Sequence, residues 1–369
     1  MKSNLIRILM AFGCISALPA LCFVTAGFVT PASAQGIPNV TVIASTVPAN
    51  GDVNPYGLAV VPTTVGSLTQ GHFLVSNFNS IQNLQGTGTT IVDVAPNGAT
   101  RLFAQINPAT LPGPCPGGIG LTTALSVLKT GWVIVGSLPT TDGTSATAQA
   151  GCLLVLDSNG NVAETFYGSL INGPWDSVVN DGGSAASLFI TNVLNGTVAA
   201  NGNIVNEGTV VRIDLLIPSG QMPSIQSMTV VGSTFAERTD PAALVIGPTG
   251  LGLTRSTLYV ADTLNNRIAA ITDPLSRTTS QGTGSTLTKN GSLNSPLGLT
   301  VPPNGNIFTV NGGDGYFVIT NPTGDQTFKK LLDNTGNPPG AGALFGITNV
   351  PGAGLYFVDD ASNTLNLFQ

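Results

Sequence analysis

A short apolar strand that ends in a small or Asx residue recurs six times along this chain, and this repetition limits the fold more than any other feature. Each copy follows another apolar strand, and a third strand and a turn such as Asn97-Gly98 then lead to a fourth. The copies lie about 50–70 residues apart, a period typical of repeat architectures. They occupy residues 73–77, 132–136, 188–192, 258–262, 307–311 and 355–359. Four antiparallel strands per unit and six units predict an all-β, six-bladed β-propeller.

The two ends of the chain predict how this propeller closes. The last unit reaches Gln369 after only three strands, whereas residues 39–43 form an apolar strand with no partner nearby in the sequence. An unpaired edge strand is a liability that a closed ring removes. We therefore expect the N-terminal strand to complete the last blade.

The first 34 residues have the pattern of a secretory signal peptide. Lys2 and Arg7 precede an apolar run at 8–29, and an A-x-A cleavage site follows at 32–34. This pattern predicts a cleaved leader at 1–34, one propeller domain at 35–369, and a secreted, periplasmic or cell-envelope location. The alternative is that the long apolar run is kept as a membrane anchor. No other stretch is apolar enough to span a bilayer after cleavage.

Two cysteines remain beyond the leader, Cys115 and Cys152. Exported proteins meet oxidising conditions, so an even pair predicts one structural disulfide. A redox pair or a cysteine metal site would need C-x-x-C spacing, which the chain lacks.

The charge balance excludes several classes of partner. Only 8% of residues are charged, and 12 Lys and Arg stand against 18 Asp and Glu. Binding to nucleic acid requires a basic patch that neutralises phosphates, and this chain cannot assemble one. We expect a protein, glycan or small-molecule partner, and the sequence indicates no organic cofactor.

One unit resembles an NHL repeat. Residues 247–253 read GPTGLGL and residues 258–268 read LYVADTLNNRI, and a looser match follows at 295–311. Asn266 stands where that family usually has histidine. The resemblance implies a six-bladed propeller. Relatives of this shape include secreted binding proteins, lyases and metal-dependent lactonases.

In a propeller, the beginnings of the innermost strands and the ends of the second strands meet on one face, which we call the start face. The leading hypothesis is a non-catalytic binding module that uses this face. The chain lacks the usual combinations of catalytic residues, which argues against an enzyme. Its predicted ligand-binding residues are Tyr56, Asn77, Trp175, Asn192, Thr249, Asn311 and Phe345. The alternative for each residue is a structural role, because Asx residues stabilise turns and aromatic rings fill gaps between blades.

The alternative function is a metal-dependent lyase, hydrolase or lactonase with carboxylates on the central channel. Asp176, Asp262 and Asp359 are the candidate ligands, and calcium is the cation that suits such oxygen donors. The single histidine, His72, precedes a second strand on the opposite face, which excludes a multi-histidine metal site. The three glutamates do not begin innermost strands. A structural role in an envelope assembly is a third alternative.

Overall fold

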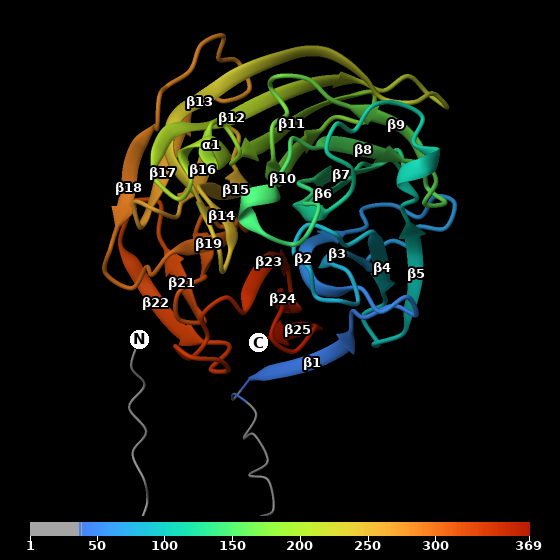
Figure 1. The fold of residues 1–369 in the computed structure, drawn as a ribbon. Coiled ribbons are helices and arrows are strands. Elements are labelled where there is room, and N and C mark those ends of the chain that lie inside the picture. Colours follow the sequence, from blue (N-terminus) through green and yellow to red (C-terminus); the bar gives the residue numbers. More distant parts are fainter. Residues whose placement is uncertain (1–36, 38) are drawn as a thin grey trace, which may run out of the picture. The chain divides into compact units, whose positions relative to one another are not determined.

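The structure is a computed structural model that describes residues 37 and 39–369, so the predicted signal peptide at 1–34 lies outside the described residues. Residues 39–369 form six antiparallel sheets arranged as blades around a central channel (Figure 1). The prediction of an all-β, six-bladed propeller is therefore confirmed. Among the described residues, no helix is both long and apolar enough to cross a membrane.

The blades follow one another along the chain. The first contains β2 (Val53–Val60), β3 (Phe73–Asn79), β4 (Thr90–Val94) and β5 (Thr100–Gln105). The second contains β6 (Leu121–Val127), β7 (Val133–Ser137), β8 (Cys152–Leu156) and β9 (Val162–Phe166). The third contains β10 (Pro174–Asp181), β11 (Ala185–Asn192), β12 (Val205–Leu216), β13 (Ser224–Asp240) and β14 (Leu244–Ile246). The fourth contains β15 (Pro248–Leu253), β16 (Thr257–Asp262), β17 (Arg267–Thr272) and β18 (Ser285–Lys289). The fifth contains β19 (Pro296–Thr300), β20 (Ile307–Asn311), β21 (Tyr316–Thr320) and β22 (Gln326–Leu331). The sixth contains β23 (Leu344–Val350), β24 (Gly354–Asp359), β25 (Thr364–Phe368) and β1 (Val40–Ser45).

The sixth blade closes the ring as the sequence predicts. Strand β1 pairs antiparallel with β25, from Val40 opposite Phe368 to Ser45 opposite Thr364. Figure 1 shows this blue strand beside the red strands of the C-terminus. Two segments at opposite ends of the sequence thus share one sheet, which leaves the propeller without an unpaired blade.

The third blade departs from the four-strand prediction. Strand β13 is 17 residues long and continues past the blade into a hairpin with the short fifth strand β14, where Arg238 pairs with Ile246. A four-residue helix, α1 (Thr197–Ala200), follows β11 and contacts β13. Short 3-10 turns at η1 (Pro108–Thr110) and η2 (Ser145–Thr147) complete the helical elements of the described chain.

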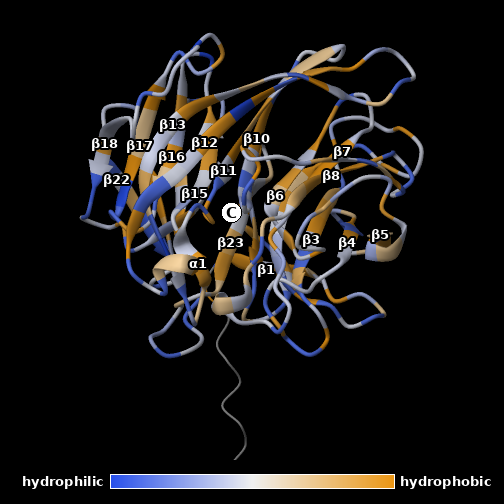
Figure 2. Cartoon of the chain, turned by 45° about the horizontal axis from the view of Figure 1, so that its top comes forward, coloured by the Kyte–Doolittle hydropathy of each residue, from blue (hydrophilic) through white to orange (hydrophobic). Residues whose placement is uncertain are grey.

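The hydrophobic core lies between neighbouring blades. One apolar cluster joins Leu74 and Ile91 of the first blade to Val135 and Leu154 of the second, and similar clusters occupy the other inter-blade spaces. In Figure 2 the most hydrophobic stretches follow the strands, whereas the loops are mostly pale or blue. The middle strands of the blades, such as β4 and β8, are buried on both faces, which explains why they are nearly continuous apolar runs. Outer strands such as β22 are more exposed and more polar.

The innermost strands β2, β6, β10, β15, β19 and β23 contact one another in this order and line the channel. Glycine allows their close approach. A Cβ atom on Gly298 would overlap the carbonyl oxygen of Phe345, and one on Gly346 would lie 2.5 Å from the carbonyl oxygen of Tyr56. A residue with a side chain would push the neighbouring strand away at either position.

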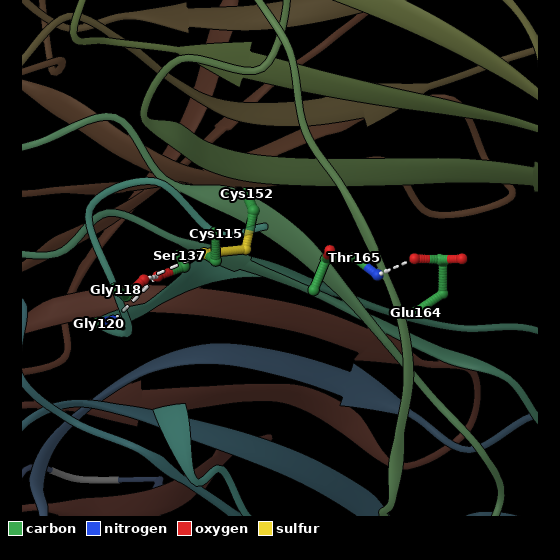
Figure 3. Close-up of a disulfide and its surroundings, with 7 residues drawn as sticks. All are labelled: Cys115, Gly118, Gly120, Ser137, Cys152, Glu164 and Thr165. Carbon is green, nitrogen blue, oxygen red and sulfur yellow. Dashed lines mark hydrogen bonds between the residues drawn. A yellow bond between two sulfur atoms is a disulfide. The ribbon is translucent and has the colours of Figure 1, made fainter. Parts of the chain in front are cut away.

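The predicted disulfide is present. Cys115 and Cys152 are joined, with their Cα atoms 5.1 Å apart (Figure 3). The bond ties the loop before β6 to the first residue of β8. Beside it, the Ser137 hydroxyl donates to the carbonyl oxygen of Gly118 and accepts from the amide of Gly120, which fixes the same loop on the second blade.

We expect loss of this disulfide to lower the free energy of unfolding by roughly 4 kcal/mol, because it closes a loop of 37 residues and so restricts the unfolded chain. The measurement is guanidinium unfolding of the C115S/C152S double variant beside the wild-type protein. The single variant C115S should lose as much as the double variant, since either change breaks the same bond. Equal midpoints for wild type and double variant would contradict the expectation.

Candidate functional site in the central channel

Aromatic and aliphatic side chains close the channel at the start face. The ring of Tyr56 stacks on Phe345 with centroids 3.8 Å apart and on Phe78 at 4.5 Å, and the edge of Trp175 lies 5.6 Å away. We call these four residues the aromatic plug. Leu138, Ala148, Val193, Leu194, Leu244 and Val245 belong to the same cluster. They come from the loops that follow β7 and β11 and from β14, so these segments cover the plug.

The aromatic residues that the sequence assigned to a ligand face are therefore core residues. Tyr56 is 3% exposed, Trp175 is 2% exposed and Phe345 is 7% exposed. Burial, with the nearby Asp360 carboxylate, raises the pKa of Tyr56 well above its ordinary value. The phenol stays neutral and contributes to packing.

The Asn residues of the same prediction tie loops to blades. Each of them lies at or near the end of a second strand and donates its side-chain amide to a carbonyl oxygen in the loop that leads into its own blade. The acceptors are Thr46 for Asn77 at 3.1 Å, Leu170 for Asn192 at 3.1 Å and Ser292 for Asn311 at 2.9 Å. Ser137 makes the equivalent bond to Gly118 in the second blade. The repeated polar residue thus has a repeated structural role, and Thr249, also buried, bonds to Thr263 at 2.7 Å.

The three predicted metal ligands occupy different environments. Asp262 is fully buried and is held by Arg267 Nε at 2.7 Å and by the Asn265 amide. Asp359 accepts from the amide of Ser362 and lies near the Asp333 carboxyl group. Asp176 lines the channel. Within residues 37 and 39–369, no three Asp, Glu, His or Cys side chains lie close enough together to hold a metal ion.

His72 lies in the loop before β3, and its Nδ1 atom is 2.7 Å from Asp93 Oδ1. Its partner is a carboxylate on β4, outside the channel. The histidine is a loop residue, as the sequence suggests.

Below the plug the channel widens into a cavity of about 280 Å³. The second halves of the innermost strands line it, from Leu58 to Val60 in β2 and from Asp176 to Val179 in β10. Asp176 is 8% exposed, the residues at 177–179 are half-buried, and residue 180 is exposed. The cavity therefore opens toward solvent at the face opposite the plug, which we call the end face.

Asp176 occupies a position that most blades reserve for glycine. In five blades, one residue of the innermost strand pairs with the repeated Asn or Asp of the second strand. Two positions after that residue stand Gly57, Asp176, Gly250, Gly298 and Gly346. The corresponding residue of the second blade is Thr123. Two neighbouring blades thus place polar side chains at a level where the other four have none. Aligning the six innermost strands would have revealed this from sequence.

The Asp176 carboxyl group is desolvated but anchored. Its Oδ2 atom accepts from the backbone amide of Leu251 at 2.8 Å. Burial raises the pKa of Asp176 to about 7, although the amides of Leu251 and Ser177 act in the opposite direction. The hydroxyl of Thr123 lines the same cavity, is buried, and has no partner within the protein. A carboxyl group that titrates near neutrality and an available hydroxyl therefore share one cavity.

Two further aspartates carry raised pKa values near the start face. Burial raises the pKa of Asp359 to about 6, and the neighbouring Asp333 adds to this shift. Burial also raises the pKa of Asp360 to about 7, with a further contribution from the Asp359 carboxylate. The side chain of Asp333 lies beside Asp359 and is 5% exposed. These groups lie outside the channel cavity, whose lining they do not join.

Comparison with known proteins identifies structures with a similar fold. No protein-family model matches the sequence, and no curated protein matches it. The structure is similar to that of a gluconolactonase from Xanthomonas campestris, with a TM-score of 0.53 and 13% identity over 87% of each chain. It is also similar to regucalcin, a calcium-binding protein from Agrobacterium tumefaciens, with a TM-score of 0.53 and 14% identity over 89% of this chain and 95% of that one. At these identities the shared feature is the fold. The resemblance to NHL-like six-bladed propellers is confirmed at that level.

The leading hypothesis of a non-catalytic binding module is wrong. One of the similar structures is a gluconolactonase, which is an enzyme of the class named in the alternative. The physical reason is visible in the channel: the start face, on which the hypothesis depended, is closed by the aromatic plug, whereas the cavity opens at the other end.

The channel residues do not fit a calcium ion. Calcium takes six to eight oxygen ligands, usually with several carboxylates among them. Among the described residues, Asp176 is the one acidic side chain that lines this cavity, and one of its oxygens is bonded to the Leu251 amide. We therefore derive no catalytic step in the channel through a metal.

Proposed function

We propose that the chain is a hydrolase that cleaves a small, uncharged ester or lactone in the central channel, with Asp176 as the general base. The observation that carries the proposal is the buried Asp176 carboxyl group, with a pKa of about 7, at the inner end of a cavity that opens toward solvent. General bases are most effective when their pKa lies near the working pH. The fold similarity to a gluconolactonase supports this class of reaction.

The bond from Leu251 fixes the Asp176 carboxylate and leaves lone pairs free for a water molecule. Asp176 takes a proton from this water while the water oxygen attacks the acyl carbon of the substrate. The bond to the alkoxide oxygen then breaks, and the alkoxide receives the proton from Asp176. The products are a carboxylic acid and an alcohol, or one hydroxy acid from a lactone. The Thr123 hydroxyl is available to donate to the substrate carbonyl, where negative charge develops.

The cavity also defines the substrate class. Its described lining contains aliphatic side chains and hydroxyl groups but no Lys, Arg or His. An anionic substrate would therefore be desolvated without a compensating charge. A volume of about 280 Å³ lies at the lower limit of typical small-molecule sites. Both observations favour a small neutral molecule.

The proposal places this reaction outside the cytoplasm. The leader pattern at 1–34 supports export. The disulfide between Cys115 and Cys152 supports an oxidising compartment.

We expect hydrolysis of γ- and δ-lactones or 4-nitrophenyl acetate, with kcat/KM rising through about pH 7 and levelling above it. The rise reflects conversion of Asp176 to its basic form. The measurement is a pH–rate profile with the mature chain in the presence of EDTA. Activity that disappears with EDTA and returns with calcium would contradict the metal-free step, and no hydrolysis of any of these compounds would contradict the proposed function.

A further inference from the structure

Two of the three glutamates in this chain, Glu207 and Glu237, lie close in register on adjacent strands of the third blade. Glu237 of β13 pairs with Val205 of β12, and Phe235 pairs with Gly208. Three steps on β12 thus match two steps on β13, so a bulge inserts one extra residue next to Glu207. Two carboxylates on adjacent strands repel each other, and this repulsion destabilises the sheet unless a cation or a proton offsets it.

Glu237 is buried without a partner. Its exposed fraction is 0%, and neither carboxyl oxygen accepts a hydrogen bond of ordinary geometry. The adjacent cation in the sequence, Arg238, pairs with Asp240 at 2.6 Å. Buried polar groups are nearly always satisfied, so an orphaned carboxyl group indicates a missing proton donor, water molecule or ion.

The loop after β11 joins the two glutamates. The side-chain amide of Asn195 donates to the carbonyl oxygen of Glu207 at 3.0 Å. A Cβ atom on Gly196 would lie 2.9 Å from Glu207 Oε2, so this carboxylate is packed against the loop backbone. Thr197 begins α1, which contacts β13, and its buried hydroxyl also has no partner.

We propose that Glu237 and Glu207 bind a calcium ion at the start of the loop that leads into α1. Carboxylate, hydroxyl and backbone carbonyl oxygens are the donors that calcium prefers, and its flexible geometry allows water to complete the shell. The ion offsets the repulsion between the two glutamates and supplies the partner that Glu237 lacks. This site lies on the outer strands of the third blade, separate from the channel cavity, so it holds the loop over the aromatic plug and takes no part in the hydrolysis.

The protonated alternative makes a different prediction. Burial raises the pKa of Glu237 to about 9, and the Glu207 carboxylate adds to this shift. The backbone amide of Asn195, which lies nearby without making a hydrogen bond of ordinary geometry, acts in the opposite direction. A neutral acid at this position would need no ion and would be indifferent to calcium. Calcium binding therefore distinguishes the two.

The test is calorimetric titration of calcium into the mature chain at pH 7.5, together with thermal melts in EDTA and in 1 mM calcium. We expect one ion per chain and a melting temperature that rises by roughly 3–8 °C. E237Q should lower the affinity at least tenfold. E207Q should do the same, and because Glu207 is exposed, this variant tests the site even if E237Q does not fold.

E164Q is the matched control, since Glu164 is the remaining glutamate and its carboxylate accepts from the amide of Thr165 on β9 (Figure 3). It should bind calcium as the wild-type protein does. No calcium binding by the wild-type chain, or wild-type affinity in both E237Q and E207Q, would overturn the proposal. Neither result would affect the proposed hydrolysis, which is measured in EDTA.

Discussion

Replacing Asp176 by asparagine should lower kcat/KM for lactone or ester hydrolysis by about 10²–10⁴-fold, the usual contribution of a positioned general base. Asparagine has nearly the same shape and can still accept the bond from the Leu251 amide, but it cannot take a proton from water. The measurement is the rate at pH 8 with D176N and wild type, beside circular dichroism spectra that establish the same fold.

D157N is the matched control for this variant. Asp157 lies in a turn of the second blade, where it accepts from the amides of Asn159 and Asn161. The change removes one carboxylate outside the channel and should leave hydrolysis unchanged. Activity in D176N equal to that of D157N would show that the channel carboxylate is not the base.

The fold could be predicted because its determinants repeat. Six copies of one strand pattern specify six blades, and the unpaired strand near the N-terminus has one open edge to join, which β25 provides. The disulfide follows from an even cysteine count and an export signal. The extension of β13 into a hairpin could not be predicted, because nothing in one sequence shows that Leu244 and Val245 would fold back over the channel.

The site was predicted only in part, because burial decides the role of each side chain. The sequence predicts Asp176 at the channel as a metal ligand. In the structure, burial raises the pKa of its carboxyl group, and the described lining of the cavity contains no other acidic side chain. Tyr56 and Trp175 were expected to face a ligand, and they pack on each other because covering loops exclude solvent. Thr123 was missed, although it occupies the position of glycine in four other blades.

Folding stability should fall as the pH rises from about 4 to 8. Burial raises the pKa of Asp176 and Asp360 to about 7 and that of Asp359 to about 6, from an ordinary 3.8. In this window the folded chain holds protons that the unfolded chain releases, so the stabilisation is complete below about pH 4 and is lost as the pH passes through the folded values. Without calcium, Glu237 extends the loss toward pH 9.

Other aspartates reduce the folding stability at low pH. Hydrogen bonds from side chains lower the pKa of Asp142 and Asp325, although burial acts in the opposite direction. Their contribution is present above the ordinary pKa and is lost as the pH falls through the lowered values. We therefore expect a stability maximum near pH 4–5, measured as the guanidinium midpoint in EDTA. A midpoint that stays constant or rises between pH 5 and 8 would contradict the raised values.

D176N should then be more stable than the wild-type protein at pH 8, and by a clearly smaller margin at pH 5, where the folded wild-type chain still holds the Asp176 proton. Ionising Asp176 in the channel costs on the order of 4 kcal/mol for a pKa displaced from 3.8 to about 7, and asparagine avoids this cost. The substitution expected to slow hydrolysis is thus expected to stabilise the fold, as is common where a catalytic group is held in an unfavourable environment. A structural carboxylate would give the reverse result, with D176N destabilised at pH 8. The unfolding midpoints of the two proteins at pH 5 and pH 8 therefore separate a catalytic role for Asp176 from a structural one.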